Sequence, residues 1–169
     1  MCFICDGGTY DELRRKTEAD IDTFGLHIVA VERSSGGVGW AYSIGLLERF
    51  AHPELVVNGA CCFGCAGARL NALGEAIAGG ERFEAGDAHT PSDRRAPVAR
   101  FGAVHPHHWQ TSLFAAWLDH YDGRPWAPTP AALQVISRGQ SGRWQDDPSN
   151  RWWRRLRLDR PPHLPGTRT

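Results

Sequence analysis

Residues 38–59 read VGWAYSIGLLERFAHPELVVNG, and this segment indicates two β-strands joined by a turn. Every second residue from position 40 to 44 is aromatic or β-branched, which is the period-two pattern of a strand. Pro53 cannot donate a backbone hydrogen bond, so we expect strand pairing to resume only after it. Gly45 and Gly59 follow the two predicted strands, where the absence of a side chain permits a positive φ.

The remaining pattern predicts an α+β fold. Further strands are expected at residues 26–32, 98–104 and 133–137, and helices at residues 10–23, 62–78 and 109–121. Strands and helices alternate without a strict βαβ rhythm. We therefore expect a single domain at residues 1–137 with a mixed or antiparallel sheet of about five strands, two to three packed helices and a cysteine-bearing N-terminal arm. Residues 138–169 are rich in Trp, Arg and Pro, and they predict a C-terminal extension that packs on the domain or is partly disordered.

Composition limits the classes of partner. The chain has 169 residues, of which 41% are apolar, so it can bury a core. Its formal net charge is zero, which argues against nucleic acid as a partner. No apolar run approaches the roughly 20 residues that cross a bilayer, and the first residues do not resemble a secretory signal. We expect a cytoplasmic protein without a membrane partner, in which cysteines are reduced.

Two cysteine pairs carry the sharpest chemical signal. Cys2 and Cys5 form one C-x-x-C motif, and Cys62 and Cys65 form a second. Two such pairs are the ligand set of a tetrahedral zinc site, so zinc or another transition metal is the expected cofactor. Their separation is far longer than the roughly 15–20 residues of a compact zinc site, so the fold has to bring the arm against the second helix. A disulfide, a redox pair or simple packing of small apolar side chains are the alternatives.

A histidine cluster lies between the fourth predicted strand and the helix that follows it. His105 and His108 are three residues apart and share a face if the helix has begun. At a helix N-terminus the helix dipole disfavours the imidazolium, which leaves a neutral base or metal ligand. His27 and His120 add further imidazoles. The alternative is that these histidines cap the helix or lie on the surface.

Several motifs fall in an order that resembles a known family. They are Met-Cys-x-x-Cys-Asp at residues 1–6, WAYSIGL at 40–46, PELVV at 53–57, LQVI at 133–136 and LRLDRP at 156–161. This combination is similar to the bacterial domain-of-unknown-function family 4262, and it covers roughly residues 1–137. The resemblance implies a small stand-alone cytosolic protein, in some cases encoded near biosynthetic genes, but no established activity. The pair Cys62 and Cys65 departs from the family pattern.

These signals together predict a protein that binds a small-molecule ligand or substrate. Trp40 and Tyr42 are expected to line an aromatic pocket, with Trp40 contacting the bound molecule. His105, His108 and Tyr42 are the candidate catalytic residues of a metal-dependent tailoring or accessory enzyme.

A non-catalytic protein is the alternative function. In that case Cys2 and Cys5 tie down the arm of a zinc-stabilised or partner-binding module. Trp152 and Trp153 are a natural contact for a homodimer if they are exposed. Arginines interleaved with these tryptophans could stack on bases, but the neutral chain favours cation–π packing instead.

Overall fold

The computed structural model describes residues 7–31, 39–59, 63–110, 114–122, 131–138, 142–149 and 157–161. The first half of the chain contains α1 (Tyr10–Phe24), β1 (His27–Val31), β2 (Trp40–Ile44), α2 (Leu46–Phe50), β3 (Glu54–Asn58) and α3 (Phe63–Ala78). The second half contains β4 (Ala88–His89), β5 (Ala99–Ala103), the 3₁₀ helix η1 (Pro106–Gln110), α4 (Ala115–Tyr121) and β6 (Ala132–Ser137).

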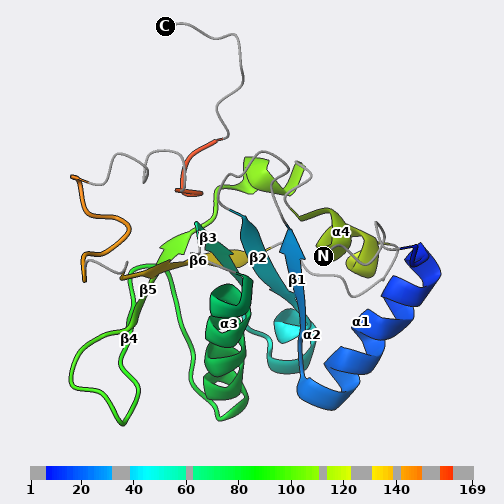
Figure 1. Ribbon diagram of the computed structural model, residues 1–169, viewed down its shortest axis with the longest axis horizontal. Coiled ribbons are helices and arrows are strands. Elements are labelled where there is room, and N and C mark those ends of the chain that lie inside the picture. Colours follow the sequence, from blue (N-terminus) through cyan, green and yellow to red (C-terminus); the bar gives the residue numbers. More distant parts are fainter. Residues whose placement is uncertain are drawn as a thin grey trace, which may run out of the picture.

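The strands form one mixed sheet in the order β1-β2-β3-β6-β5-β4 (Figure 1). The pair β3–β6 at the centre is parallel, and the other neighbouring strands are antiparallel. In the described residues this sheet has six strands, accompanied by four α-helices. The predicted α+β class and the single domain with a mixed sheet are therefore confirmed.

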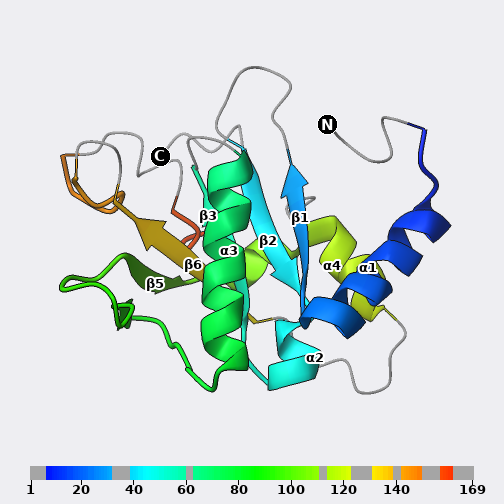
Figure 2. The ribbon, with the colours of Figure 1, turned by 60° about the horizontal axis from the view of Figure 1, so that its bottom comes forward.

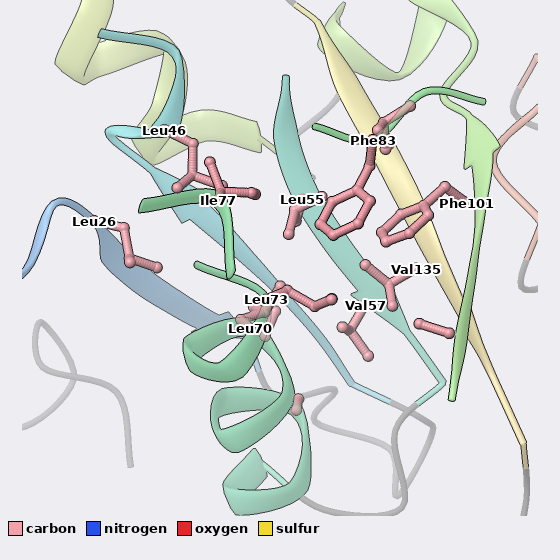
Figure 3. Close-up of a cluster of buried hydrophobic side chains, with 14 residues drawn as sticks. Leu26, Leu46, Leu55, Val57, Leu70, Leu73, Ile77, Phe83, Phe101 and Val135 are labelled. Carbon is pink, nitrogen blue, oxygen red and sulfur yellow. The ribbon is translucent and has the colours of Figure 1, made fainter. Parts of the chain in front are cut away.

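Helix α3 covers one face of the sheet (Figure 2). Its residues Leu70, Leu73 and Ile77 recur at helical spacing and are at most 3% exposed. Figure 3 shows them facing side chains of the central strands, beside Phe83 stacked on Phe101. This half of the core contains Leu26, Ala41, Leu46, Leu55, Val57, Ala66, Leu70, Leu73, Ile77, Phe83, Ala99, Phe101, Leu133 and Val135.

Helices α1 and α4 and the 3₁₀ helix η1 contribute to a second apolar cluster, which includes the other face of β2 and β3. It contains Ile21, Tyr42, Ile44, Val56, Trp109, Phe114, Trp117, Tyr121, Ala132 and Leu158. Its aromatic rings contact each other closely, with 4.2 Å between the centroids of Trp109 and Phe114 and 4.4 Å between those of Trp117 and Tyr121. Because Tyr42 and Val56 belong to this cluster while Ala41 and Val57 belong to the other, both faces of β2 and β3 are buried.

Local signals explain the ends of α1. The Thr9 hydroxyl accepts a hydrogen bond from the Glu12 backbone, and the Glu12 carboxylate accepts one from the Thr9 backbone, which completes a capping box. Gly25 ends the helix with φ 81°, in the left-handed region that glycine adopts most easily.

Three elements differ from the sequence prediction, and the first is β4, a strand of two residues where no strand was expected. The predicted turn between β2 and β3 contains a helix, α2, of five residues. The predicted helix at residues 109–121 is divided into η1 and α4. His108 donates its backbone N–H to the His105 carbonyl at 3.0 Å, an i→i−3 bond that makes the first turn a 3₁₀ helix.

Parts of the predicted C-terminal extension contact the domain. The side-chain amide nitrogen of Gln145 lies 3.4 Å from the Asn58 carbonyl oxygen. The side-chain oxygen of Gln145 accepts the Ser137 backbone N–H at 3.0 Å. Leu158 is 4% exposed and donates its N–H to the Gln134 side chain at 2.8 Å. Residues 1–6, which carry the cysteines of the predicted N-terminal arm, and the dimer contact at residues 152–153 lie outside the described residues.

None of the helices in the described part of the chain has the length and apolar character that crossing a bilayer requires.

Candidate functional site

A pocket of about 410 Å³ lies where α3, the loop before β5 and the end of β6 meet. Four of the residues that line it are arginines, namely Arg69, Arg94, Arg95 and Arg138. Residues 96–98, an alanine, a proline and a valine, complete the wall. In the described part of the chain, the lining residues are therefore either cationic or apolar.

The β4–β5 hairpin positions two of these arginines. Arg94 donates its backbone N–H to the Pro91 carbonyl at 2.9 Å, which closes a turn. Val98 donates its backbone N–H to the His89 carbonyl at 2.9 Å, which extends the pairing of β4 with β5. Arg94 and Arg95 therefore extend from a connection that is fixed at both ends by the backbone.

An aromatic ring orients the arginine at the end of β6. The Arg138 guanidinium carbon lies 4.9 Å from the centroid of the Trp144 ring, and the two residues also form an isolated β-bridge. Arg100 lies 4.3 Å from the same centroid and 3.6 Å from an Asp146 carboxylate oxygen. A guanidinium stacked on a ring keeps its N–H groups at its edge, where they can donate to an acceptor.

Arginines are the charged residues among the described lining of this pocket. Asp93 lies 3.5 Å from the Arg94 guanidinium and offsets part of that charge, but both side chains are largely exposed and the pair is weak. An arginine fork matches a carboxylate or phosphate geometrically and stays protonated at any physiological pH. The arginines can therefore donate to an anion, and none of the described lining residues would accept a proton.

The structure places the predicted aromatic residues in the core. Tyr42 is 1% exposed, its hydroxyl accepts the Ala116 backbone N–H at 3.2 Å, and burial raises its pKa to about 12. Trp40 is half-buried and packs against the second core cluster. These contacts give Tyr42 a packing role, and its catalytic role and the ligand contact of Trp40 stay predictions.

The two predicted histidines lie on or beside η1 and bind the C-terminal segment. The His108 Nε2 donates to the Arg160 carbonyl at 2.8 Å, and burial lowers the pKa of its imidazole. The His105 backbone N–H donates to the Leu158 carbonyl at 2.6 Å, while its Nδ1 accepts the His107 backbone N–H at 3.2 Å. These contacts anchor residues 158–160 to the domain, and an acid–base or metal role stays a prediction.

The predicted zinc site falls largely on residues that the structure does not describe. Cys2, Cys5 and Cys62 lie outside the described residues. Cys65 lies in the first turn of α3, where it is exposed and disulfide-bonded. In the described ranges no three His, Cys, Asp or Glu side chains are grouped as a metal would require. A disulfide-bonded sulfur is not a thiolate, so the expectation of reduced cysteines does not hold for Cys65, and the four-thiolate zinc site, which stays a prediction, would need this cysteine in its reduced form.

The two further imidazoles that the sequence analysis named, His27 and His120, pair separately with carboxylates. His27 Nδ1 lies 2.7 Å from an Asp20 oxygen, and burial lowers the pKa of this histidine. His120 is 5% exposed, and its Nε2 lies 3.5 Å from a Glu48 oxygen.

A buried carboxylate, that of Glu54 on β3, links β3 to β2. Glu54 is 0% exposed and accepts hydrogen bonds from the Ser43 hydroxyl at 2.5 Å, the Gly45 N–H at 2.9 Å and the Leu47 N–H at 3.1 Å. The Tyr121 hydroxyl donates to it at 3.2 Å. Glu54 therefore satisfies the free N–H groups at the start of α2 and ties that helix to α4.

Burial raises the pKa of Glu54, and these four donors oppose the rise. The pKa of Tyr121 is raised as well, mainly by its own burial and then by the nearby Glu54 charge. The polar residues of WAYSIGL and PELVV thus have structural partners inside the fold.

Sequence reasoning missed the arginine pocket. Its cationic residues are spread from position 69 to position 138, and the sheet order brings their elements together. The sequence signal for this pocket was the adjacent pair Arg94 and Arg95 shortly before a strand. The net charge of the whole chain is zero, so it did not reveal this local group of positive charges.

The comparisons with known proteins add a family and no activity. A family model described as a domain of unknown function, DUF4262, matches residues 20–150, which include all four pocket arginines. No curated protein and no solved structure matches the chain.

Proposed function

The chain belongs to the DUF4262 family, a domain of unknown function, and from this premise we propose that it binds a small anionic molecule in the arginine-lined pocket. The observation that carries the proposal is that four arginines, spread from position 69 to position 138, line one pocket of about 410 Å³. Like charges repel, so an arrangement of this kind is stabilised by an anion that accepts hydrogen bonds from several of them.

The lining supports an accessory, ligand-binding role better than catalysis by the pocket itself. Arginine does not release its proton at physiological pH, and the described wall residues Ala96, Pro97 and Val98 carry no nucleophile or base. The proposal keeps the predicted small-molecule ligand but places it in the arginine-lined pocket and not beside Trp40. The reason is that Tyr42, the other residue predicted to line an aromatic pocket, is packed in the core.

Isothermal titration calorimetry with inorganic phosphate, pyrophosphate and citrate at low ionic strength tests this function. The double variant Arg94→Ala/Arg138→Ala removes two donors from the pocket. Hydrogen bonds to charged groups contribute roughly 1.5–3 kcal/mol each, so the loss of each group weakens binding roughly 10-fold to 100-fold, and the double variant is expected to lose at least that much.

Arg15→Ala is the matched control, since Arg15 is an exposed arginine on α1, outside the pocket. This control should bind as the wild-type protein does. Affinity should also fall as salt rises, because exposed charges are screened. Equal binding by the double variant and the wild-type protein would contradict the proposal, as would the absence of binding by all three anions.

A further inference from the structure

We infer that the ligand of this pocket is a small organic phosphate whose phosphate is held by the arginines and whose apolar body lies on residues 96–98. This inference rests on the proposed function and narrows it to a class of ligand. It combines the size of the pocket, its divided lining and the way its groups are held in place.

The pocket is larger than a lone inorganic anion needs. Its volume of about 410 Å³ corresponds to roughly 14 water molecules at about 30 Å³ each. Pockets that bury small organic ligands usually measure about 300–1,000 Å³. An inorganic phosphate would leave much of this space to solvent, whereas an organic ester would fill it.

The lining divides into a cationic part and an apolar part. Val98 is 38% exposed, so part of its side chain is accessible to a ligand in the pocket. Together with Ala96 and Pro97 it offers a methyl-rich and methylene-rich surface beside the guanidinium groups. A ligand that gains from both parts has an anionic end and an apolar end.

Both parts are held in place before a ligand arrives. Pro97 has a restricted φ, and Val98 is bonded to the His89 carbonyl, so the apolar wall is stiff. Arg138 is stacked on Trp144, which limits the freedom of its long side chain. Less conformational entropy is therefore lost on binding than with mobile arginines.

Phosphate suits this cationic part better than a single carboxylate. A phosphate monoester carries close to two negative charges at neutral pH and has three terminal oxygens. Such a group can accept from more than one arginine fork at once, and four arginines line the pocket.

The test compares inorganic phosphate, phenyl phosphate and phenol by calorimetry on the full chain. Phenyl phosphate is expected to bind at least about 10-fold more tightly than inorganic phosphate, and phenol is expected not to bind measurably. Arg138→Ala should weaken the binding of both phosphates. Val98→Ser should reduce the preference for phenyl phosphate to within about 3-fold and leave inorganic phosphate unchanged.

The outcomes separate this inference from the proposed function. If phenyl phosphate binds no more tightly than inorganic phosphate, or if Val98→Ser keeps the full preference, the organic class is wrong while anion binding stands. If neither phosphate binds, the proposed function fails. A circular dichroism spectrum of Val98→Ser, expected to match that of the wild-type protein because the side chain is partly exposed, excludes unfolding as the cause.

Discussion

Replacing Glu54 tests whether this buried carboxylate stabilises the centre of the fold. In Glu54→Ala, two hydroxyls and two backbone N–H groups lose their acceptor, and none of them can turn to solvent at a position that is 0% exposed. Each hydrogen bond contributes about 1 kcal/mol net, and the lost methylene about 0.8 kcal/mol more. We therefore expect the free energy of unfolding to fall by roughly 5 kcal/mol, against roughly 5–15 kcal/mol for an average domain.

Glu54→Gln should be much milder. Three of the four donors point to one oxygen, Oε1, and only the Ser43 hydroxyl lies against Oε2. A glutamine amide nitrogen at the Oε2 position can donate to the Ser43 oxygen, which already accepts the Leu55 N–H at 2.9 Å and has a second lone pair. We expect Glu54→Gln to cost about 1 kcal/mol at acidic pH.

The same pair of variants tests the pKa of Glu54, which burial raises in the folded state. Above the ordinary pKa of a glutamate, about 4.3, the unfolded chain releases this proton while the folded chain keeps it. The unfolded state then binds fewer protons, so wild-type stability falls by up to about 1.4 kcal/mol per pH unit until the folded pKa is reached. Glu54→Gln lacks this dependence, so its stability relative to the wild type should rise with pH.

Urea denaturation at several pH values from 4.5 to 8 measures both effects. Glu54→Ala losing less than about 1 kcal/mol would mean that the four hydrogen bonds contribute little. Parallel pH profiles for Glu54→Gln and the wild type would refute the raised pKa. In that case the four donors, and not burial, would determine the ionisation of Glu54.

Two further predictions concern α3 and the contact at Phe83. Gly67→Ala should raise the free energy of unfolding by about 0.5–1 kcal/mol, since nothing lies within 4 Å of the added methyl group. Gly74→Ala should lower the free energy of unfolding, because the added methyl group would lie 2.7 Å from a Leu26 methyl group. A higher melting temperature for Gly74→Ala than for Gly67→Ala would contradict this packing. His52 accepts the Phe83 N–H at 3.0 Å through Nε2, and burial lowers its pKa. Its contribution to stability should therefore be complete above about pH 6.5, the pKa of the unfolded chain, and be lost below it as pH falls through the lower pKa of the folded state. His52→Gln should flatten that part of the urea-derived stability profile, and an unchanged profile would assign the pH dependence to other groups.

Much of the fold could be predicted because the strands are short and strongly patterned. The predicted strands at 26–32, 98–104 and 133–137 correspond to His27–Val31, Ala99–Ala103 and Ala132–Ser137. Glycine pairs and caps also marked helix ends, as at Gly25. These signals depend on neighbours in the chain, which sequence reasoning can see.

Helix α2 could not be predicted because it leaves no local signal in the sequence. Its five residues are too few to show a helical period, and its N-cap is Gly45, whose φ is 115° and which makes no side-chain cap. The acceptor for the Gly45 and Leu47 N–H groups is Glu54, which belongs to the following strand. A cap supplied from another element leaves no local mark in the sequence.

The candidate site shows the same limit at longer range. Aromatic and imidazole side chains attracted attention because their chemistry is versatile, yet Tyr42 and His108 are buried against backbone partners. The arginines attracted none because each one alone is an ordinary surface residue. Only the hairpin at β4–β5 and the end of β6 bring Arg94 and Arg138 to one pocket.

The motif residues and the pocket residues therefore have different tasks. Ser43, Gly45 and Glu54 meet one another inside the protein, so a chain that keeps them keeps the junction of β2, α2 and β3. A ligand that contacts only Arg94 and Arg138 does not touch that junction. It follows that the motifs WAYSIGL and PELVV report on the fold, and that the ligand of a given member has to be inferred from the pocket. Arginine at the pocket positions of a relative would predict an anionic ligand there, and apolar residues would predict a different one.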